Sequence, residues 1–269
     1  MNKFNVSLAQ MSVVSANIEA NIKKGEKFIS EAARRGSQLI AFPEMWTTGF
    51  DWVYNERMAV EHEKAVSKIG DMARKYNIWI TGSMLKLAKS GRPSNSALLF
   101  DAKGKIVAQY AKSHLYSLLR EDRHMERGDS LCLADTPWGK AGLSVCYDIR
   151  FPEVFRTYAL KGAEMVFSPM AFMYPKLHHW KTLIRARAIE NQLFMIGVNR
   201  VGSEDFAKDG NVIYFGASAV IDPWGETVVE AAENKEELIT AVLDLDRVTE
   251  VREKMKVLED RRPELYELG

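Results

Sequence analysis

The chain has 269 residues, with 37 Lys and Arg against 36 Asp and Glu, which gives a formal net charge of +1. A content of 46% hydrophobic and 27% charged residues excludes disorder as the main state, and the near-neutral charge argues against a nucleic-acid or membrane-surface protein, which would need a basic field. The longest stretch without charge, 4–18, is too short and too polar for a membrane span or a signal peptide.

Strand and helix patterns alternate from the start of the chain. An apolar strand pattern over 4–10 precedes a helical pattern over 17–35, which Gly36 ends. The apolar run 38–42 then predicts a second strand, stopped by a proline. The next predicted elements are a helix over about 57–76, a strand over 78–81, and a hairpin of strands 96–100 and 106–110.

The second half of the chain repeats this order. Three pairs of segments match at offsets of 126, 115 and 121 residues: 33–43 with 159–169, 77–82 with 192–197, and 96–104 with 217–225. The repeat predicts an α/β fold made of two αββα halves about a pseudo-twofold axis. Because no Pro/Gly/Ser-rich linker separates the halves, we expect residues 1–269 to form a single domain.

Three reactive side chains come directly after predicted strands. Glu44 follows the strand at 38–42, Lys112 follows 106–111, and Cys146 follows 141–145. Side chains at the carboxyl ends of strands meet at one edge of a sheet, where α/β proteins bind ligands. Taken singly, such a Glu or Lys is more often solvated and such a Cys more often part of the core.

Together these residue types suggest acyl transfer through a thioester. The Cys146 thiol needs a base or a positive neighbour to become a nucleophile, and Glu44 could take its proton and return it to a leaving amine. Burial in an apolar cleft would raise the pKa of Glu44 toward neutrality, as this role requires. Lys112 and the backbone N–H of Tyr147 could stabilise the oxyanion that forms when sulfur attacks a carbonyl.

Three segments resemble the signature segments of the nitrilase or carbon–nitrogen hydrolase superfamily: 42–44 (FPE), 112–115 (KSHL) and 146–153 (CYDIRFPE). They stand in the family's order, and the resemblance covers essentially the whole chain. It implies a four-layer αββα sandwich and a catalytic triad of Glu44, Lys112 and Cys146.

The segment 121–129 is similar to a family stretch that begins with a second glutamate and ends in Gly-Asp. The resemblance implies that Glu121 is an additional active-site carboxylate that positions the lysine and the substrate. Arg127 stands where the family usually has proline, which leaves Glu126 as an alternative, and the plain alternative for Glu121 is a solvated loop residue.

Within the family, 146–153, 179–192 and 198–202 resemble the amidase branch, especially ω-amidases that hydrolyse 2-oxoglutaramate and related amides of dicarboxylic acids. The free carboxylate of such a substrate would need a cation, and an arginine can bind it through two hydrogen bonds. Arg150 is the candidate nearest to the nucleophile, and its alternative is a structural ion pair with Glu153.

Aromatic and Met residues near the expected strand ends are candidates for the walls of the substrate pocket. These are Tyr116, Phe172, Met173 and Tyr174, although such side chains more often serve packing. Tyr147 is expected to bind the substrate through its backbone N–H. We expect no metal and no nucleotide cofactor, because the five histidines show no ligand spacing and no Gly-rich phosphate loop is present.

The leading hypothesis is an enzyme that cleaves a small linear amide to acid and ammonia. The alternatives are a nitrilase, an N-carbamoyl-amino-acid hydrolase, an amidase acting on deaminated glutathione, or a non-catalytic binding protein on the same fold. Cys132 and Cys146 cannot build a disulfide framework, so we expect a reduced, cytoplasmic protein. The resemblance also implies a homodimer or larger homo-oligomer, to which the tail 261–266 could contribute.

Overall fold

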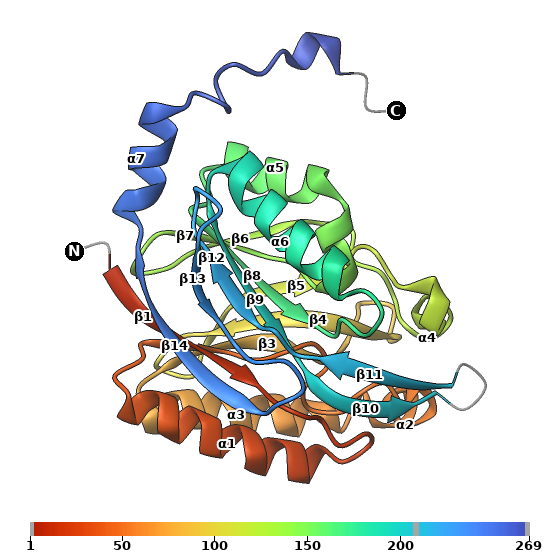
Figure 1. Ribbon diagram of the computed structural model, residues 1–269. Coiled ribbons are helices and arrows are strands. Elements are labelled where there is room, and N and C mark those ends of the chain that lie inside the picture. Colours follow the sequence, from red (N-terminus) through yellow and green to blue (C-terminus); the bar gives the residue numbers. More distant parts are fainter. Residues whose placement is uncertain (1–2, 207–209, 267–269) are drawn as a thin grey trace.

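The computed structural model describes residues 3–206 and 210–266, in which two six-stranded sheets pack face to face between two layers of helices (Figure 1). The first sheet has the order β14-β1-β2-β3-β4-β5. Its strands are β1 (Lys3–Gln10), β2 (Leu39–Ala41), β3 (Trp79–Leu87), β4 (Pro93–Phe100), β5 (Ile106–Ala111) and β14 (Glu237–Asp244).

The second sheet has the order β13-β12-β9-β8-β7-β6. Its strands are β6 (Cys132–Asp135), β7 (Lys140–Leu143), β8 (Met165–Met170), β9 (Phe194–Asn199), β12 (Ala219–Ile221) and β13 (Thr227–Glu230). Beside it, β10 (Val201–Asp205) and β11 (Asn211–Phe215) form a separate two-stranded ribbon.

The two sheets repeat one topology. In the first, β1, β2 and β3 run parallel, and β4, β5 and the edge strand β14 run antiparallel to their neighbours. In the second, β7, β8 and β9 run parallel, while β12, β13 and the edge strand β6 run antiparallel to theirs. This match confirms the predicted duplication. Each half supplies one sheet and one helix layer, so αββα describes the layers of the two halves together.

The helices occupy equivalent places in the two halves. α1 (Ile18–Arg34) and α3 (His62–Tyr76) cover the first sheet, and α5 (Pro152–Leu160) and α6 (Leu177–Asn191) cover the second (Figure 1). α7 (Asp246–Lys254) follows β14 and leads into a tail that extends away from the sandwich. No helix in the described residues is long and apolar enough to cross a membrane.

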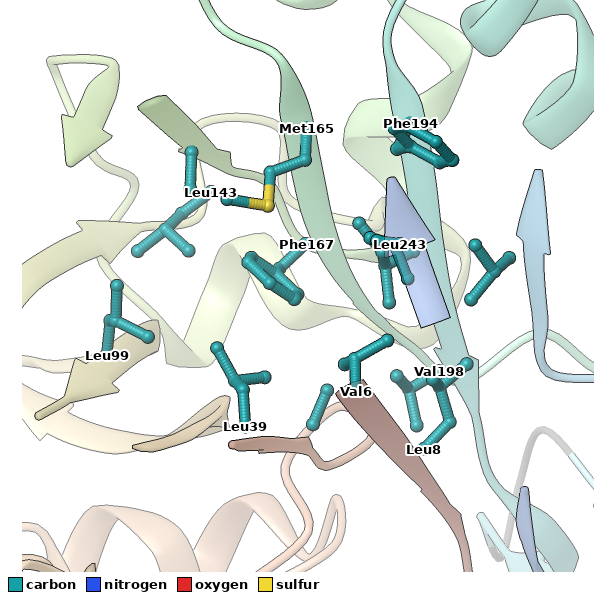
Figure 2. Close-up of a cluster of buried hydrophobic side chains, with 14 of the residues drawn as sticks. Val6, Leu8, Leu39, Leu99, Leu143, Met165, Phe167, Phe194, Val198 and Leu243 are labelled. Atoms are coloured by element: carbon teal, nitrogen blue, oxygen red, sulfur yellow. The ribbon is translucent and has the colours of Figure 1, made fainter. Parts of the chain in front are cut away.

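The largest apolar cluster lies between the two sheets (Figure 2). Successive side chains of a strand point to opposite faces of the sheet, so one strand contributes to two apolar clusters. In β2, Leu39 and Ala41 point at the opposite sheet, while Ile40 points at the helices. Phe167 of β8 meets the first sheet from the other side. Each such side chain stabilises the fold by about 1.5–3 kcal/mol when fully buried, so the sheets are held together by many of these contacts.

The region predicted as one helix over about 57–76 is two helices. The short helix α2 (Trp52–Met58) begins at Asp51, whose side chain accepts a hydrogen bond from the backbone N–H of Tyr54, and α3 begins only at His62. The prediction was wrong there because the intervening turn contains neither Gly nor Pro, which are the residues that usually mark a break. The short helices near the site are η1 (Ser117–Leu119), α4 (Glu121–His124) and η2 (Cys146–Arg150).

Candidate active site

The structure places Glu44, Lys112 and Cys146 in the wall of one pocket. Glu44 lies three residues beyond β2, Lys112 directly follows β5, and Cys146 opens η2 just after β7. The first two side chains therefore come from one sheet and the third from the other. The pocket lies where the ends of these strands meet across the sandwich, with an empty volume of about 480 Å³ including its mouth.

Lys112 lies between two carboxylates. Its Nζ donates to Glu44 Oε1 at 2.8 Å and to Glu121 Oε2 at 2.7 Å, and all three side chains are 2% exposed. Burial opposes the charge of the lysine, but the nearby charges of Glu121 and Glu44 outweigh it and hold the pKa of Lys112 well above its usual value. Lys112 is therefore a fixed positive charge at neutral pH.

The acid and the thiol of the pocket both hold their protons more tightly than in water. Burial, with the charge of Glu121, raises the pKa of Glu44, although Lys112 opposes the shift. Burial and the charge of Glu44 raise the pKa of Cys146 well above its usual value. The thiol is thus protonated at rest, and its activation requires a proton transfer to a base, for which Glu44 is the adjacent group.

The backbone turn that carries Cys146 is unusual. Its φ of 43° lies in the left-handed region, which costs a non-glycine residue about 1–3 kcal/mol and persists only where its surroundings enforce it. Asp148 supplies part of that support, because its fully buried carboxylate accepts a hydrogen bond from the backbone N–H of Val145 at 2.8 Å. Arg187 holds the far end of the turn through a 2.9 Å bond from its Nε to the carbonyl of Ile149.

Asp148 also joins this turn to the segment after β5. Its Oδ1 lies 2.7 Å from His114 Nδ1, and its Oδ2 accepts a 2.9 Å hydrogen bond from the hydroxyl of Tyr110. The chain that carries Lys112 and the turn that carries Cys146 are therefore fixed to each other through one carboxylate. Sequence reasoning did not identify Asp148 or Tyr110.

The structure distinguishes the two candidate glutamates of the 121–129 segment. Glu121 is buried in the pocket, where its Oε2 also accepts a 2.7 Å hydrogen bond from the backbone N–H of Tyr116. Glu126 instead bonds Ser90, outside the pocket. Glu121 is therefore not a solvated loop residue, and Glu126 does not lie in the pocket.

All four predicted substrate-binding residues line the pocket: Tyr116, Tyr147, Arg150 and Phe172. Met173 lies there too, whereas Tyr174 is not part of the lining. The remaining walls, which sequence reasoning missed, are Phe50, Trp52, Leu119, Ala171 and Lys176. Most of these come from loops whose course the sequence pattern does not predict.

Two cations reach the pocket besides Lys112. The Arg150 guanidinium lies over the ring of Phe172, 5.7 Å from its centroid, and its Nη2 is 3.3 Å from His179 Nδ1. Lys176 Nζ lies 5.6 Å from the centroid of the Tyr116 ring. In residues 3–206 and 210–266, neither cation is paired with a carboxylate, and the alternative pair of Arg150 with Glu153 does not form.

Asn95 is a further polar residue at the site that sequence reasoning missed. It lies in β4 and is 1% exposed, and its Nδ2 donates to Glu44 Oε1 at 2.8 Å and to Glu121 Oε1 at 3.0 Å. The available signal was the strand pattern, since Asn95 shares a strand face with the apolar Ala97 and Leu99. A polar side chain on such a face needs partners, and here the partners are two catalytic candidates.

Other reactive groups lie apart from this pocket. Cys132 is in β6, packed against the core between the sheets and outside the pocket lining. No group of three or more His, Cys, Asp or Glu side chains in the described part of the chain is arranged to hold a metal ion.

The carbon–nitrogen hydrolase family model matches residues 5–253. This chain belongs to the carbon–nitrogen hydrolase family. It is 34% identical to the 2-oxoglutaramate amidase of Bacillus subtilis (strain 168), over 98% of this chain and 100% of that protein. It is 31% identical to the omega-amidase NIT2 of Xenopus tropicalis, over 99% of this chain and 98% of that protein.

The solved structure of an amidase shares the architecture described above. A mutant of the amidase from Nesterenkonia sp. AN1 superposes with a TM-score of 0.86 at 25% identity, covering 97% of this chain and 98% of that chain. That structure shows Michael addition of acrylamide at its active-site cysteine. The comparisons confirm the family and the fold predicted from the three sequence segments.

Proposed function

We propose that this carbon–nitrogen hydrolase is an amidase of the ω-amidase type, which hydrolyses the monoamide of a small dicarboxylic acid to the dicarboxylate and ammonia. The observation that carries the proposal is the pair of uncompensated cations, Arg150 and Lys176, in the same pocket as Cys146. A bound carboxylate would supply the negative charge that both of them lack. The similarity to a 2-oxoglutaramate amidase supports the same substrate class.

The proposed reaction proceeds through a thioester. Glu44 takes the proton of the Cys146 thiol while sulfur attacks the amide carbon, and Lys112 with the N–H of Tyr147 stabilises the oxyanion. As the C–N bond breaks, Glu44 returns the proton to the departing nitrogen, which leaves as ammonia. Glu44 then takes a proton from water, the hydroxide attacks the thioester carbon, and the C–S bond breaks to regenerate the thiol.

Glu121 has a supporting role in this scheme. Its charge keeps Lys112 protonated, so that the ammonium group can face the oxyanion while Glu44 changes its protonation state during the cycle. The rise in the pKa of Glu44 supports its role as a base and acid, because a general base works best when its pKa lies near the working pH.

Ammonia release from a matched pair of amides tests the substrate class. We expect hydrolysis of succinamate and 2-oxoglutaramate to exceed that of butyramide, which has the length of succinamate without its carboxylate. Arg150→Met and Lys176→Met should each raise KM for succinamate about tenfold, the value of one charge-assisted contact. Their effect on butyramide should be small, and Lys161→Met, at an exposed lysine outside the pocket, serves as control.

The same assay distinguishes the other reactions. Cys146→Ala should release no ammonia from any amide, and equal release by this variant and the wild type would refute the thioester mechanism. Preferred release of ammonia from butyronitrile would indicate a nitrilase, and carbon dioxide from a carbamoyl amino acid would indicate a carbamoylase. Equal KM for succinamate in the wild type and both cation variants would refute the carboxylate site.

The proposal extends to where the protein works and how it assembles. A nucleophilic thiol must stay reduced, which fits the cytoplasm. The tail that leaves the sandwich exposes Leu265 by 64% and Tyr266 by 48%, which supports its packing on a second copy (Figure 1). Light scattering should therefore give a dimer or larger homo-oligomer, and a monomer at micromolar concentration would contradict it.

A further inference from the structure

Asn95 joins the two carboxylates of the pocket on the side opposite Lys112. Lys112 Nζ and Asn95 Nδ2 each donate to both Glu44 and Glu121, so the four side chains form a closed ring. Both donors reach the same oxygen of Glu44, Oε1. On Glu121 they reach different oxygens, and the backbone N–H of Tyr116 adds a third hydrogen bond.

The two glutamates of the ring differ in which of their oxygens accept hydrogen bonds. Both oxygens of Glu121 accept hydrogen bonds, so its carboxylate is held in one orientation. In Glu44 the two bonds fall on Oε1, which leaves Oε2 as the oxygen able to exchange a proton with Cys146 and the substrate. An oxygen that already accepts two hydrogen bonds from an ammonium and an amide is the weaker base of the pair.

We propose that Asn95 is a positioning residue for amide hydrolysis: together with Lys112 it holds Glu44 Oε1, so that Oε2 faces Cys146 and alone carries the proton during the reaction. Without the amide, the Glu44 carboxyl group could rotate and take its proton on the oxygen turned away from the thiol. The inference rests on the proposed function, since it assigns Glu44 the role of base.

The fold does not require the Asn95 side chain for its own packing. The pairing of β4 with the segment after β5 uses the Asn95 main chain, whose carbonyl accepts a 2.9 Å hydrogen bond from the Lys112 N–H. The side-chain Oδ1 is buried and has no hydrogen-bond partner. Leaving an acceptor unpaired costs stability, so the amide is better explained by what its Nδ2 does than by what it adds to folding.

The test compares two substitutions at Asn95 with one at the next residue. Asn95→Ala removes the donor, and Asn95→Asp keeps the size of the side chain while replacing the amide nitrogen by oxygen. Ser96→Ala is the control: Ser96 is equally buried in β4 but bonds Ser94 on the opposite strand face. Thermal unfolding of each variant monitors the fold.

Two measurements report how well Glu44 acts as a base. The first is kcat and KM for succinamate between pH 5 and 9. The second needs no turnover: N-ethylmaleimide, which has no primary amide, forms a C–S bond with Cys146 while the thiol proton passes through Glu44 to the neighbouring ring carbon, and intact mass gives the rate at each pH. Cys146→Ala gives the background from Cys132.

We expect Asn95→Ala to lower kcat at least about tenfold at neutral pH, with KM changed less than about twofold, because the base is misplaced and the substrate contacts are not. The Nδ2 bond favours the ionised form of Glu44, so its loss should move the acidic limb of both pH profiles upward by about one unit. Asn95→Asp should lose at least as much activity. If Asn95→Ala folds poorly, the proposal is tested on Asn95→Asp.

The proposal is overturned if both Asn95 variants keep the wild-type acidic limb and kcat within about twofold, or if Ser96→Ala causes the same changes. Failure of the proposed function has a different signature. In that case the wild type releases no ammonia from succinamate, while the pH dependence of the N-ethylmaleimide reaction still shows whether Asn95 acts on the Glu44–Cys146 pair.

Discussion

Two buried carboxylates, those of Glu44 and Glu121, lie around the ammonium group of Lys112. Glu44, Lys112 and Glu121 are each about 2% exposed, so water stabilises none of their charges. The raised pKa of Glu44 suits this residue to take up a proton as a base and to return it later as an acid. The three charges also depend on one another for folding stability.

Removing the charge of Lys112 should therefore destabilise the protein. In Lys112→Met both glutamates stay buried without their cation, so the free energy of unfolding should fall by about 3–5 kcal/mol at pH 8, measured by urea denaturation. The loss should shrink at pH 5, because the raised pKa of Glu44 lets this residue take up a proton there. Adding Glu44→Gln and Glu121→Gln to Lys112→Met should restore most of the stability but no activity. Unchanged stability in the single variant would contradict this account.

At the scale of single residues, the sequence predicted the reactive groups better than their support. Glu44, Lys112 and Cys146 could be found because each reactive side chain follows a recognisable strand. Asn95 was missed because its carboxylate partners are 51 and 26 residues away along the chain, and no local pattern shows that they meet. Asp148 was missed although it stands two residues from the nucleophile, because its bonds to Tyr110 and His114 depend on the course of another strand.

At the scale of elements, the strands carry the catalytic candidates and the irregular segments build the pocket walls. Apolar runs predicted central strands such as β2 and β9, because burial on both faces makes their sequences largely apolar. They could not predict that the turn at 59–61 separates α2 from α3, nor that Trp52 of α2 and Leu119 of η1 meet at the pocket through a 2.9 Å hydrogen bond.

The start of α3 makes the stability of the fold depend on pH. His62 is the first residue of that helix and is fully buried, with its Nε2 2.8 Å from Thr47 Oγ1. Burial lowers its pKa from 6.5 to about 4, and the positive end of the helix dipole also disfavours a charged imidazole. Because the unfolded chain binds this proton more readily, stability is complete above pH 6.5 and falls as the pH drops toward 4.

The expected loss through this group is about 3 kcal/mol between pH 7 and pH 4. Urea denaturation at several pH values measures it for the wild type and for His62→Gln, which cannot take up a proton. The difference between the two proteins should follow the window from pH 6.5 to 4, because the carboxylates are the same in both and only His62 differs. Parallel pH profiles for both proteins would show that His62 does not contribute.

At the scale of the whole molecule, the two halves share both their core and their site. Leu39 of the first sheet and Phe167 of the second belong to one apolar cluster (Figure 2), and the pocket takes Lys112 from one half and Cys146 from the other. The first sheet is also completed by β14, which comes from the end of the chain and pairs with β1. Neither half therefore has a complete sheet, core and site of its own.

This sharing predicts one cooperative unfolding transition for the whole chain. Circular dichroism, tryptophan fluorescence and ammonia release should give the same urea midpoint at a fixed protein concentration. Leu39→Ala, which opens a cavity between the sheets, should destabilise the protein by about 2–5 kcal/mol and move all three midpoints together. If the halves were separate domains, the structural signals would fall in two steps and this substitution would move one of them more than the other.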